Sequence, residues 1–339
     1  MPCGLAIKRE QVKERKMDFF KHKKIYDFVK MSNYGIVLSL ILFIASVVLF
    51  IKPGFTLGVD FAGGTLIQLQ YESPAPLAEI RAKLDSVDSY KGAQVSEFGS
   101  PEEILIKLPT ATSSVNQNIG EEVAEVLKDT GTLNIRRVDI VGPKVGSELQ
   151  EKGTLALVLA LVSIMLYVSY RYEWRFALAA VLALVHDVVI SAGAVILFDI
   201  DLNLEVIAAL LTLIGYSIND TIIIFDRIRE TIGLRVNDSL EKVINEALSA
   251  TLSRTMLTSL TMFFSVFTLY LFGGEIIKGF SLPMLVGSIV GSYSSIFVAS
   301  KLVILFKFDL KKYHQKIADA ERRALEKKKL REMYEKGRV

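Results

Sequence analysis

The sequence predicts a polytopic α-helical membrane protein with six transmembrane helices and a ferredoxin-like α+β domain between the first and the second. The 339-residue chain is 51% hydrophobic, and its apolar residues gather in six runs. Each run is long enough to cross a hydrocarbon core of about 30 Å at about 1.5 Å per residue. The predicted spans are 35–51, 153–170, 176–198, 203–225, 250–272 and 280–306.

The large polar segment between the first two spans, 52–152, is predicted to fold into the α+β domain. Residues 55–71 end in an alternation of apolar and polar side chains that is typical of a strand. Apolar residues at helical spacing and further short apolar runs follow. They predict helices at 76–88 and 115–128 and strands at 93–98, 103–108 and 133–141. This order, β-α-β-β-α-β, predicts a ferredoxin-like sandwich.

Charged segments flank the spans: a basic N-terminal extension at 1–34 and a charged C-terminal tail at 307–339. Lys and Arg near the ends of spans predict orientation, because they stay on the cytosolic side. They gather before span one, between spans two and three, between spans four and five, and after span six. Both termini are therefore predicted to be cytosolic. The segment 52–152 would then be extracytoplasmic, and 153–306 would form a five-helix transmembrane domain.

The net charge of +3 does not indicate nucleic-acid binding, because the Lys and Arg residues are concentrated at the cytosolic ends of the spans. The basic termini instead fit anionic lipid headgroups at the cytosolic membrane surface. Cys3 is the single cysteine, which excludes a disulfide within the chain. The first apolar run lacks a small-residue cleavage pattern and is preceded by mostly polar residues, so we expect an uncleaved anchor in place of a signal peptide.

Two charged residues at similar depth lie on neighbouring spans, Asp220 in span four and Arg254 in span five. Asp220 lies about 10 Å in from Arg227 at the cytosolic lip, and Arg254 lies about 6 Å in from Ala250 on the same side, so the two can meet in one layer. Their attraction, about 4 kcal/mol at ~4 Å and an effective dielectric near 20, is smaller than an insertion cost of about 5–7 kcal/mol. We therefore predict that Asp220 takes up a proton beside Arg254 and changes helix packing. A structural ion pair is the alternative.

Three further polar residues lie within the spans. His186 and Asp187, near the middle of span three, predict either a second proton station or a polar contact to a neighbouring helix. Asn219 precedes Asp220 and is expected either to bond to a facing helix or to line a water path. In span six, small residues predict close backbone packing; they are Gly287, Gly291, Ser292, Ser294 and Ser295.

The outer segment opens with the motif GVDFAGGT at 58–65, which predicts either a hinge or a substrate surface; its candidate residues are Gly58, Asp60, Phe61, Gly63 and Gly64. The chain has three His and contains no P-loop, zinc-ligand set, GxSxG or HExxH. We therefore predict no enzyme, no metal and no cofactor. The enzymatic alternative, an aspartyl protease using Asp187 and Asp220, places these carboxylates at depths of about 18 Å and about 10 Å, too far apart to share a proton.

Four blocks of the sequence resemble the SecF family, the smaller membrane subunit of the bacterial SecDF protein-translocation accessory complex. They are GVDFAGGT (58–65), GYSINDTIIIFDRIRE (215–230), SRTMLTSLT (253–261) and LYLFGGEIIKGFSLPMLVGSIVGSYSSIFVAS (269–300). The similarity runs from about residue 35 to residue 306. By motif position, Asp220 corresponds to the family's essential membrane aspartate and Arg254 to its span-five arginine.

The resemblance implies half of a resistance-nodulation-division transporter in the bacterial cytoplasmic (inner) membrane, completed to twelve spans by SecD. It implies that the proton motive force drives the outer domains and so promotes late stages of preprotein translocation. The implied partners are SecD, the SecYEG channel, YajC, YidC and the translocating preprotein. Two alternatives stay open: a transporter half that exports small molecules or lipids, and a passive subunit that stabilises the translocation machinery.

Overall fold

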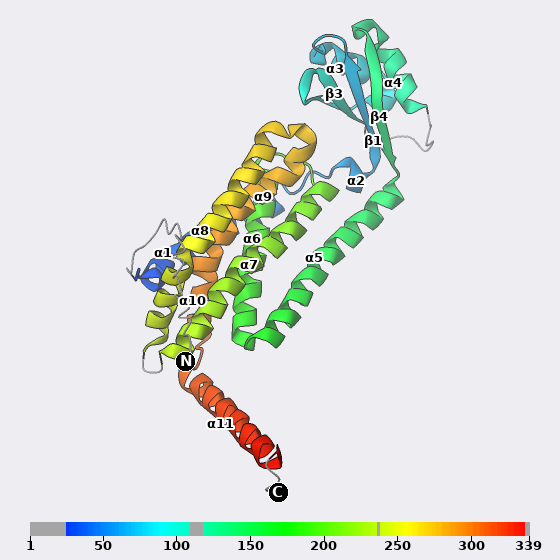
Figure 1. The fold of residues 1–339 in the computed structure, drawn as a ribbon. Coiled ribbons are helices and arrows are strands. Elements are labelled where there is room, and N and C mark those ends of the chain that lie inside the picture. Colours follow the sequence, from blue (N-terminus) through cyan, green and yellow to red (C-terminus); the bar gives the residue numbers. More distant parts are fainter. Residues whose placement is uncertain (1–24, 109–117, 236–237, 336–339) are drawn as a thin grey trace, which may run out of the picture.

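The computed structural model describes residues 25–108, 118–235 and 238–335. Within them, six helices are long and apolar enough to cross a membrane, and Figure 1 shows them side by side with a small sheet domain at one end. The first five are α1 (Phe28–Ile51), α5 (Pro143–Arg171), α6 (Trp174–Leu197), α7 (Leu204–Leu234) and α8 (Leu240–Phe272). Together with the sheet domain, they confirm the predicted fold class.

The sixth span is one continuous helical segment that consists of three consecutive elements. They are α9 (Gly274–Ser294), a π-helical turn (Ser295–Ala299) and α10 (Ser300–Leu305). Pro283 lies inside α9. π-Turns within helices widen the backbone locally and are frequent at functional sites. The charged helix α11 (Leu310–Glu335) extends from the end of the bundle opposite the sheet domain (Figure 1).

The sheet domain has the order of elements that the sequence predicts. These are α2 (Val59–Ala62), β1 (Gly64–Tyr71), α3 (Leu77–Asp85), β2 (Gln94–Phe98), β3 (Ser100–Leu108), α4 (Ile119–Leu127) and β4 (Leu133–Val141), with short 3₁₀ turns at Asp88–Tyr90 and Lys128–Thr130. The strands form one antiparallel sheet in the order β2-β3-β1-β4, as in a ferredoxin-like sandwich. One face of β1 packs Ile67 and Leu69 against Ile80 of α3 and Val123 of α4.

Several helices begin earlier than hydropathy predicts. α1 begins at Phe28 instead of residue 35, α5 at Pro143 instead of 153, and α8 at Leu240 instead of 250. The reason is that hydropathy marks the segment inside lipid, whereas a helix starts where its first N–H groups find caps. Asp27 caps α1 and Ser239 caps α8 through their side chains.

Three of the predicted segments are only partly covered. Residues 1–24 of the N-terminal extension, residues 115–117 of the predicted second outer helix and residues 336–339 of the C-terminal tail lie outside the described residues. Within the bundle, α6 and the sixth span are the most enclosed, whereas α1, α5 and α8 turn most of their apolar surface outward. The enclosed helices, together with α7, carry the polar groups described next.

Candidate functional site

Asp220 lies on α7 and is only 2% exposed. Thr258 Oγ1 donates to its Oδ1 at 3.4 Å, and Ser259 Oγ donates to its Oδ2 at 3.2 Å. Both donors lie on α8. Ser292 of α9 donates in turn to Ser259 Oγ at 2.5 Å. Asp220 therefore lies where α7, α8 and α9 meet, and hydroxyl groups are its hydrogen-bond partners.

Arg254 lies on α8, one turn from Thr258, and is exposed. Among the residues that the structure describes, no ion pair within 4.0 Å joins Arg254 to Asp220. The sequence predicted the Arg254 guanidinium beside the Asp220 carboxylate, but the hydroxyls of Thr258 and Ser259 are its hydrogen-bond partners on α8. Asn219, the neighbour of Asp220, is exposed on the surface of α7.

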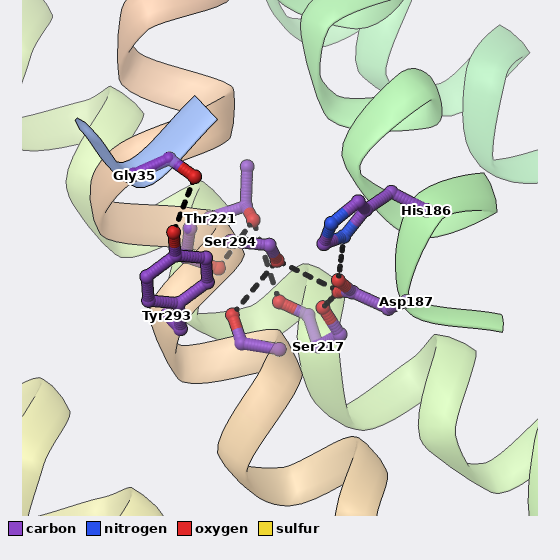
Figure 2. A network of polar contacts seen from close by, with 9 residues as sticks. Gly35, His186, Asp187, Ser217, Thr221, Tyr293 and Ser294 are labelled. Carbon is purple, nitrogen blue, oxygen red and sulfur yellow. Dashed lines mark hydrogen bonds and ion pairs between the residues drawn. The ribbon is translucent and has the colours of Figure 1, made fainter. Parts of the chain in front are cut away.

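A second polar centre surrounds Asp187 of α6, whose side chain is fully buried (Figure 2). Ser217 Oγ of α7 donates to Asp187 Oδ2 at 2.6 Å, and Ser294 Oγ of α9 donates to the same oxygen at 2.8 Å. The other oxygen, Oδ1, lies 3.0 Å from His186 Nδ1. Asp187 thus joins α6, α7 and α9 through one carboxylate.

The two hydroxyl donors limit where a proton can sit. A hydroxyl carries one hydrogen, and that of Ser217 is directed at Oδ2, so this oxygen acts as an acceptor. Ser294 Oγ lies 2.8 Å from the same oxygen and 3.1 Å from the Gly291 carbonyl oxygen. A proton shared with the histidine therefore lies between Asp187 Oδ1 and His186 Nδ1. The other ring nitrogen of His186, Nε2, is buried and has no hydrogen-bond partner among the residues that the structure describes. The ring stacks on Phe43 of α1 with centroids 6.5 Å apart.

The close approach of helices around Asp187 depends on Gly291. A Cβ at this position would lie 3.1 Å from Ser217 Oγ and 3.5 Å from Asp187 Oδ2. One turn further along α7, Thr221 Oγ1 lies 2.8 Å from Ser295 Oγ in the π-turn. The small residues that predicted close packing in span six therefore also supply hydroxyl groups to the network.

The two buried aspartates do not share a hydrogen bond in the described part of the chain. Asp187 binds His186, Ser217 and Ser294, whereas Asp220 binds the two hydroxyls of α8. An aspartyl-protease dyad needs two carboxylates in contact, so this arrangement disfavours that alternative. Within the described residues, no group of three or more His, Cys, Asp or Glu side chains is arranged to hold a metal.

The outer motif lies between the end of α1 and the first strand. Asp60 is on α2, and its Oδ2 accepts the N–H of Leu204, the first residue of α7, at 3.0 Å. Phe61 is buried. Gly63 and Gly64 have φ angles of +75° and +144°, which residues other than glycine rarely adopt. The motif thus connects the sheet domain to the membrane helices.

More than half of the chain, residues 122–309, matches the family described as protein export membrane protein SecD/SecF, C-terminal, and residues 48–75 match the SecD/SecF GG motif. Protein translocase subunit SecF of Helicobacter pylori is 55% identical over 323 residues, 95% of this chain and 100% of that protein. The subunit of the same name from Escherichia coli O157:H7 is 39% identical over 295 residues, 86% of this chain and 90% of that protein.

Two solved structures have a similar fold. The crystal structure of SecDF, a translocon-associated membrane protein from Thermus thermophilus, superimposes with a TM-score of 0.76 at 33% identity. A second structure, SecDF in a super-membrane-facing form, gives a TM-score of 0.64 at 31% identity. The first comparison covers 85% of this chain but 39% of the SecDF chain, so the chain spans well under half of that protein.

Proposed function

Since the chain belongs to the SecF family of protein translocase subunits, we propose that it uses the proton motive force to promote late stages of preprotein translocation. Asp220 is the proposed proton-carrying group, acting near Arg254. The observation that carries this proposal is the burial of an ionisable carboxylate at a junction of three helices, with hydroxyl partners in place of an ion pair. Ionisable residues inside a membrane are costly and usually mark ion pathways.

The hydroxyl of Ser259 gives this carboxylate a means to act on α8. Its oxygen lies 3.2 Å from Asp220 Oδ2 and 2.8 Å from the carbonyl oxygen of Thr255, one turn back on the same helix. The single hydroxyl hydrogen serves one acceptor at a time. An ionised carboxylate is the stronger acceptor, so protonation of Asp220 would release the hydroxyl to its own helix, where back-bonding bends the backbone.

We propose SecD as the partner that completes the membrane domain, because the chain covers 39% of a solved SecDF chain. The exposed positions of Arg254 and Asn219 are available to such a partner. The SecYEG channel, YajC, YidC, the preprotein, and anionic lipids at the basic termini are further proposed partners. We propose both termini in the cytosol, the sheet domain outside the bacterial inner membrane, and no enzymatic reaction.

For His186 and Asp187 we propose an anchoring role, with a proton held between them, in place of a second proton path. Two hydroxyl groups and the Nδ1 atom of His186 already surround the Asp187 carboxylate, and its side chain is fully buried. Such a carboxylate is suited to hold helices together and poorly suited to exchange protons at every cycle.

Asp220→Asn tests the proposed function in membrane vesicles that contain this chain together with SecD. The measurement is late-stage preprotein translocation with and without an imposed proton gradient, alongside purification of the intact complex. The expected result is an assembled complex that loses only the gradient-dependent part. The matched control is Asp226→Asn, because Asp226 lies on the same helix but is half exposed and paired with Arg171 at 3.7 Å. Full gradient dependence in Asp220→Asn would instead favour the passive, stabilising subunit.

A further inference from the structure

The loop between α6 and α7, residues 199–203, is bound by the sheet domain from two sides. On one side, Gly58 N–H donates to the Leu202 carbonyl and Leu202 N–H donates to the Thr56 carbonyl, both at 2.8 Å. On the other side, Lys107 at the end of β3 forms an ion pair with Asp201. A cleft of about 640 Å³ lies between these contacts, lined by both the sheet and the loop.

Asp60 extends this attachment to α7 itself. The first N–H groups of a helix have no partner within the helix. In α7, the side chain of Asn203 accepts the N–H of Val206 at 2.9 Å, and the carboxylate of Asp60 accepts the N–H of Leu204 at 3.0 Å. A carboxylate also interacts favourably with the positive end of the helix dipole. One of the two caps on the Asp220 helix therefore comes from a distant segment, 144 residues away in the chain.

The same motif is fixed against α5 at the backbone level. A Cβ added to Gly146 of α5 would lie 2.6 Å from the carbonyl oxygen of Phe61. A Cβ added to Gly63 would lie 3.0 Å from the backbone of Pro143. Gly64 then enters β1, where a Cβ would lie 2.6 Å from the Leu108 carbonyl oxygen. Figure 1 shows α2 between the bundle and the sheet, where these contacts meet.

We propose that Asp60 is a positioning residue that makes α7 and the sheet domain move together. This inference rests on the proposed function, since α7 carries Asp220 and the sheet domain is the part proposed to act on the preprotein. Asp60 fixes the start of α7 to a motif whose glycines pack closely against α5 and β3. A displacement of α7 at Asp220 is then transmitted to the sheet through the Asp60 cap and the loop 199–203.

A four-way comparison at constant pH tests this coupling, with Asp220→Asn as the mimic of the protonated carboxyl. The chain is purified with SecD in lipid nanodiscs, and Cys3 is replaced by Ser. Spin labels are attached at Ser89→Cys in the sheet domain and at Leu197→Cys at the outer end of α6, a helix that makes no contact with the Asp220 carboxylate among the described hydrogen bonds. Ser89 and Leu197 are both exposed. The label-to-label distance is measured with and without Asp220→Asn, in chains that carry Asp60, Asp60→Ala or Asp60→Asn. Because the pH is constant, the protonation of other groups does not differ between the samples for pH reasons.

We expect Asp220→Asn to shift the distance distribution when Asp60 is unaltered. We expect the same shift in Asp60→Asn, because the amide oxygen of asparagine can also accept the Leu204 N–H. In Asp60→Ala the shift is expected to disappear. Hydrogen exchange at Leu204 should become about five- to tenfold faster in Asp60→Ala, the ratio for loss of a typical cap, and return to normal in Asp60→Asn. This second reading confirms that the contact was removed while the rest of the complex stayed folded.

Each outcome separates the two proposals. An undiminished shift in Asp60→Ala would overturn the coupling role and leave the proposed function intact. The absence of any shift on Asp220→Asn, with Asp60 unaltered, would mean that neutralising the carboxylate moves nothing, and both proposals would fall. A cap that served only to stabilise the helix would change hydrogen exchange at Leu204 but leave the shift unchanged.

Discussion

Replacing Ser217 with alanine removes one of the two hydroxyl donors that converge on Asp187 Oδ2. Ser217 is 2% exposed, and its hydroxyl lies 2.6 Å from the carboxylate oxygen. A distance of about 2.5–2.7 Å is typical of an O–H group that donates to an ionised carboxylate. The substitution therefore tests the charge on Asp187 as well as the worth of the contact.

The expected loss in the free energy of unfolding follows from two ranges of measured hydrogen-bond contributions. Hydrogen bonds to charged groups contribute about 1.5–3 kcal/mol in proteins, whereas polar contacts between membrane helices average about 0.6 kcal/mol with a maximum near 1.7. For an ionised, fully enclosed Asp187 we expect Ser217→Ala to lower the free energy of unfolding by about 1.5 kcal/mol, where the two ranges meet. For a neutral Asp187 the loss should be near 0.6 kcal/mol.

The assay is reversible unfolding of the purified chain in detergent, titrated with SDS and followed by circular dichroism. Ser191→Ala is the matched control, because Ser191 lies on α6, is fully buried and has a hydroxyl without a hydrogen-bond partner in the described part of the chain. Its replacement should change the free energy of unfolding by less than about 0.5 kcal/mol or stabilise the chain. The double variant Ser217→Ala/Asp187→Asn should lose about 1 kcal/mol less unfolding free energy than the sum of the losses in the two single variants.

A specific result would refute this reasoning. Equal losses in Ser217→Ala and Ser191→Ala would mean that the hydroxyl contributes nothing to Asp187 beyond its volume. Strict additivity in the double variant would lead to the same conclusion, and the anchoring role of Asp187 would have to be abandoned.

Three further predictions concern packing and pH. Gly146→Ala should destabilise the chain by about 1–3 kcal/mol, measured by the same titration, because the added Cβ lies 2.6 Å from the backbone oxygen of Phe61, which cannot turn away. Gly193→Ala should loosen α1 from α6, seen as faster hydrogen exchange along α1, because its Cβ lies 3.0 Å from the Cα of Ser46. Burial raises the pKa of the Tyr71 hydroxyl. Its contribution to the free energy of unfolding is therefore present below a pH of about 10 and is lost as the pH rises through the raised pKa. Near-UV circular dichroism should show a smaller loss of stability at alkaline pH in Tyr71→Phe.

Each packing prediction has a glycine that serves as its control. A Cβ at Gly153, on the same helix as Gly146, would lie at an ordinary 3.5 Å from Ile207, so Gly153→Ala should be neutral or stabilise by up to about 1 kcal/mol through helix propensity. A Cβ at Gly233 would meet no atom of the described residues within 4 Å, so Gly233→Ala should leave exchange along α1 unchanged. For Tyr71→Phe, an undiminished alkaline loss would assign the transition to another group, such as Tyr90, whose pKa is also raised by burial.

The sequence alone predicts the fold class because each of its determinants is local. A run of apolar residues suffices to indicate a span, and the alternation that buries Ile67 and Leu69 suffices to indicate a strand. The helix ends are predicted less well, because caps such as Asp27 and Ser239 lie in polar sequence that hydropathy does not separate from loops.

The partners of the buried polar residues could not be predicted in the same way. Helical spacing indicates which face of α7 carries Asp220, but the rotation of α8 decides whether Arg254 or Ser259 meets that face. The contact of Asp187 with Ser217 and Ser294 joins residues 30 and 107 positions apart. Serine and small residues at close-packed helix crossings are the one local signal that such contacts leave in the sequence.

Three of the contacts that α7 makes act together because a helix is stiff along its axis. Its first N–H is held by Asp60, its middle by Ser217 on Asp187, and its Asp220 carboxylate by the hydroxyls of α8. The first two hold α7 to the sheet domain and to α6, whereas the third depends on whether the carboxylate is charged. A proton at Asp220 therefore acts on the one contact that can be released, and the two that persist determine where the movement goes.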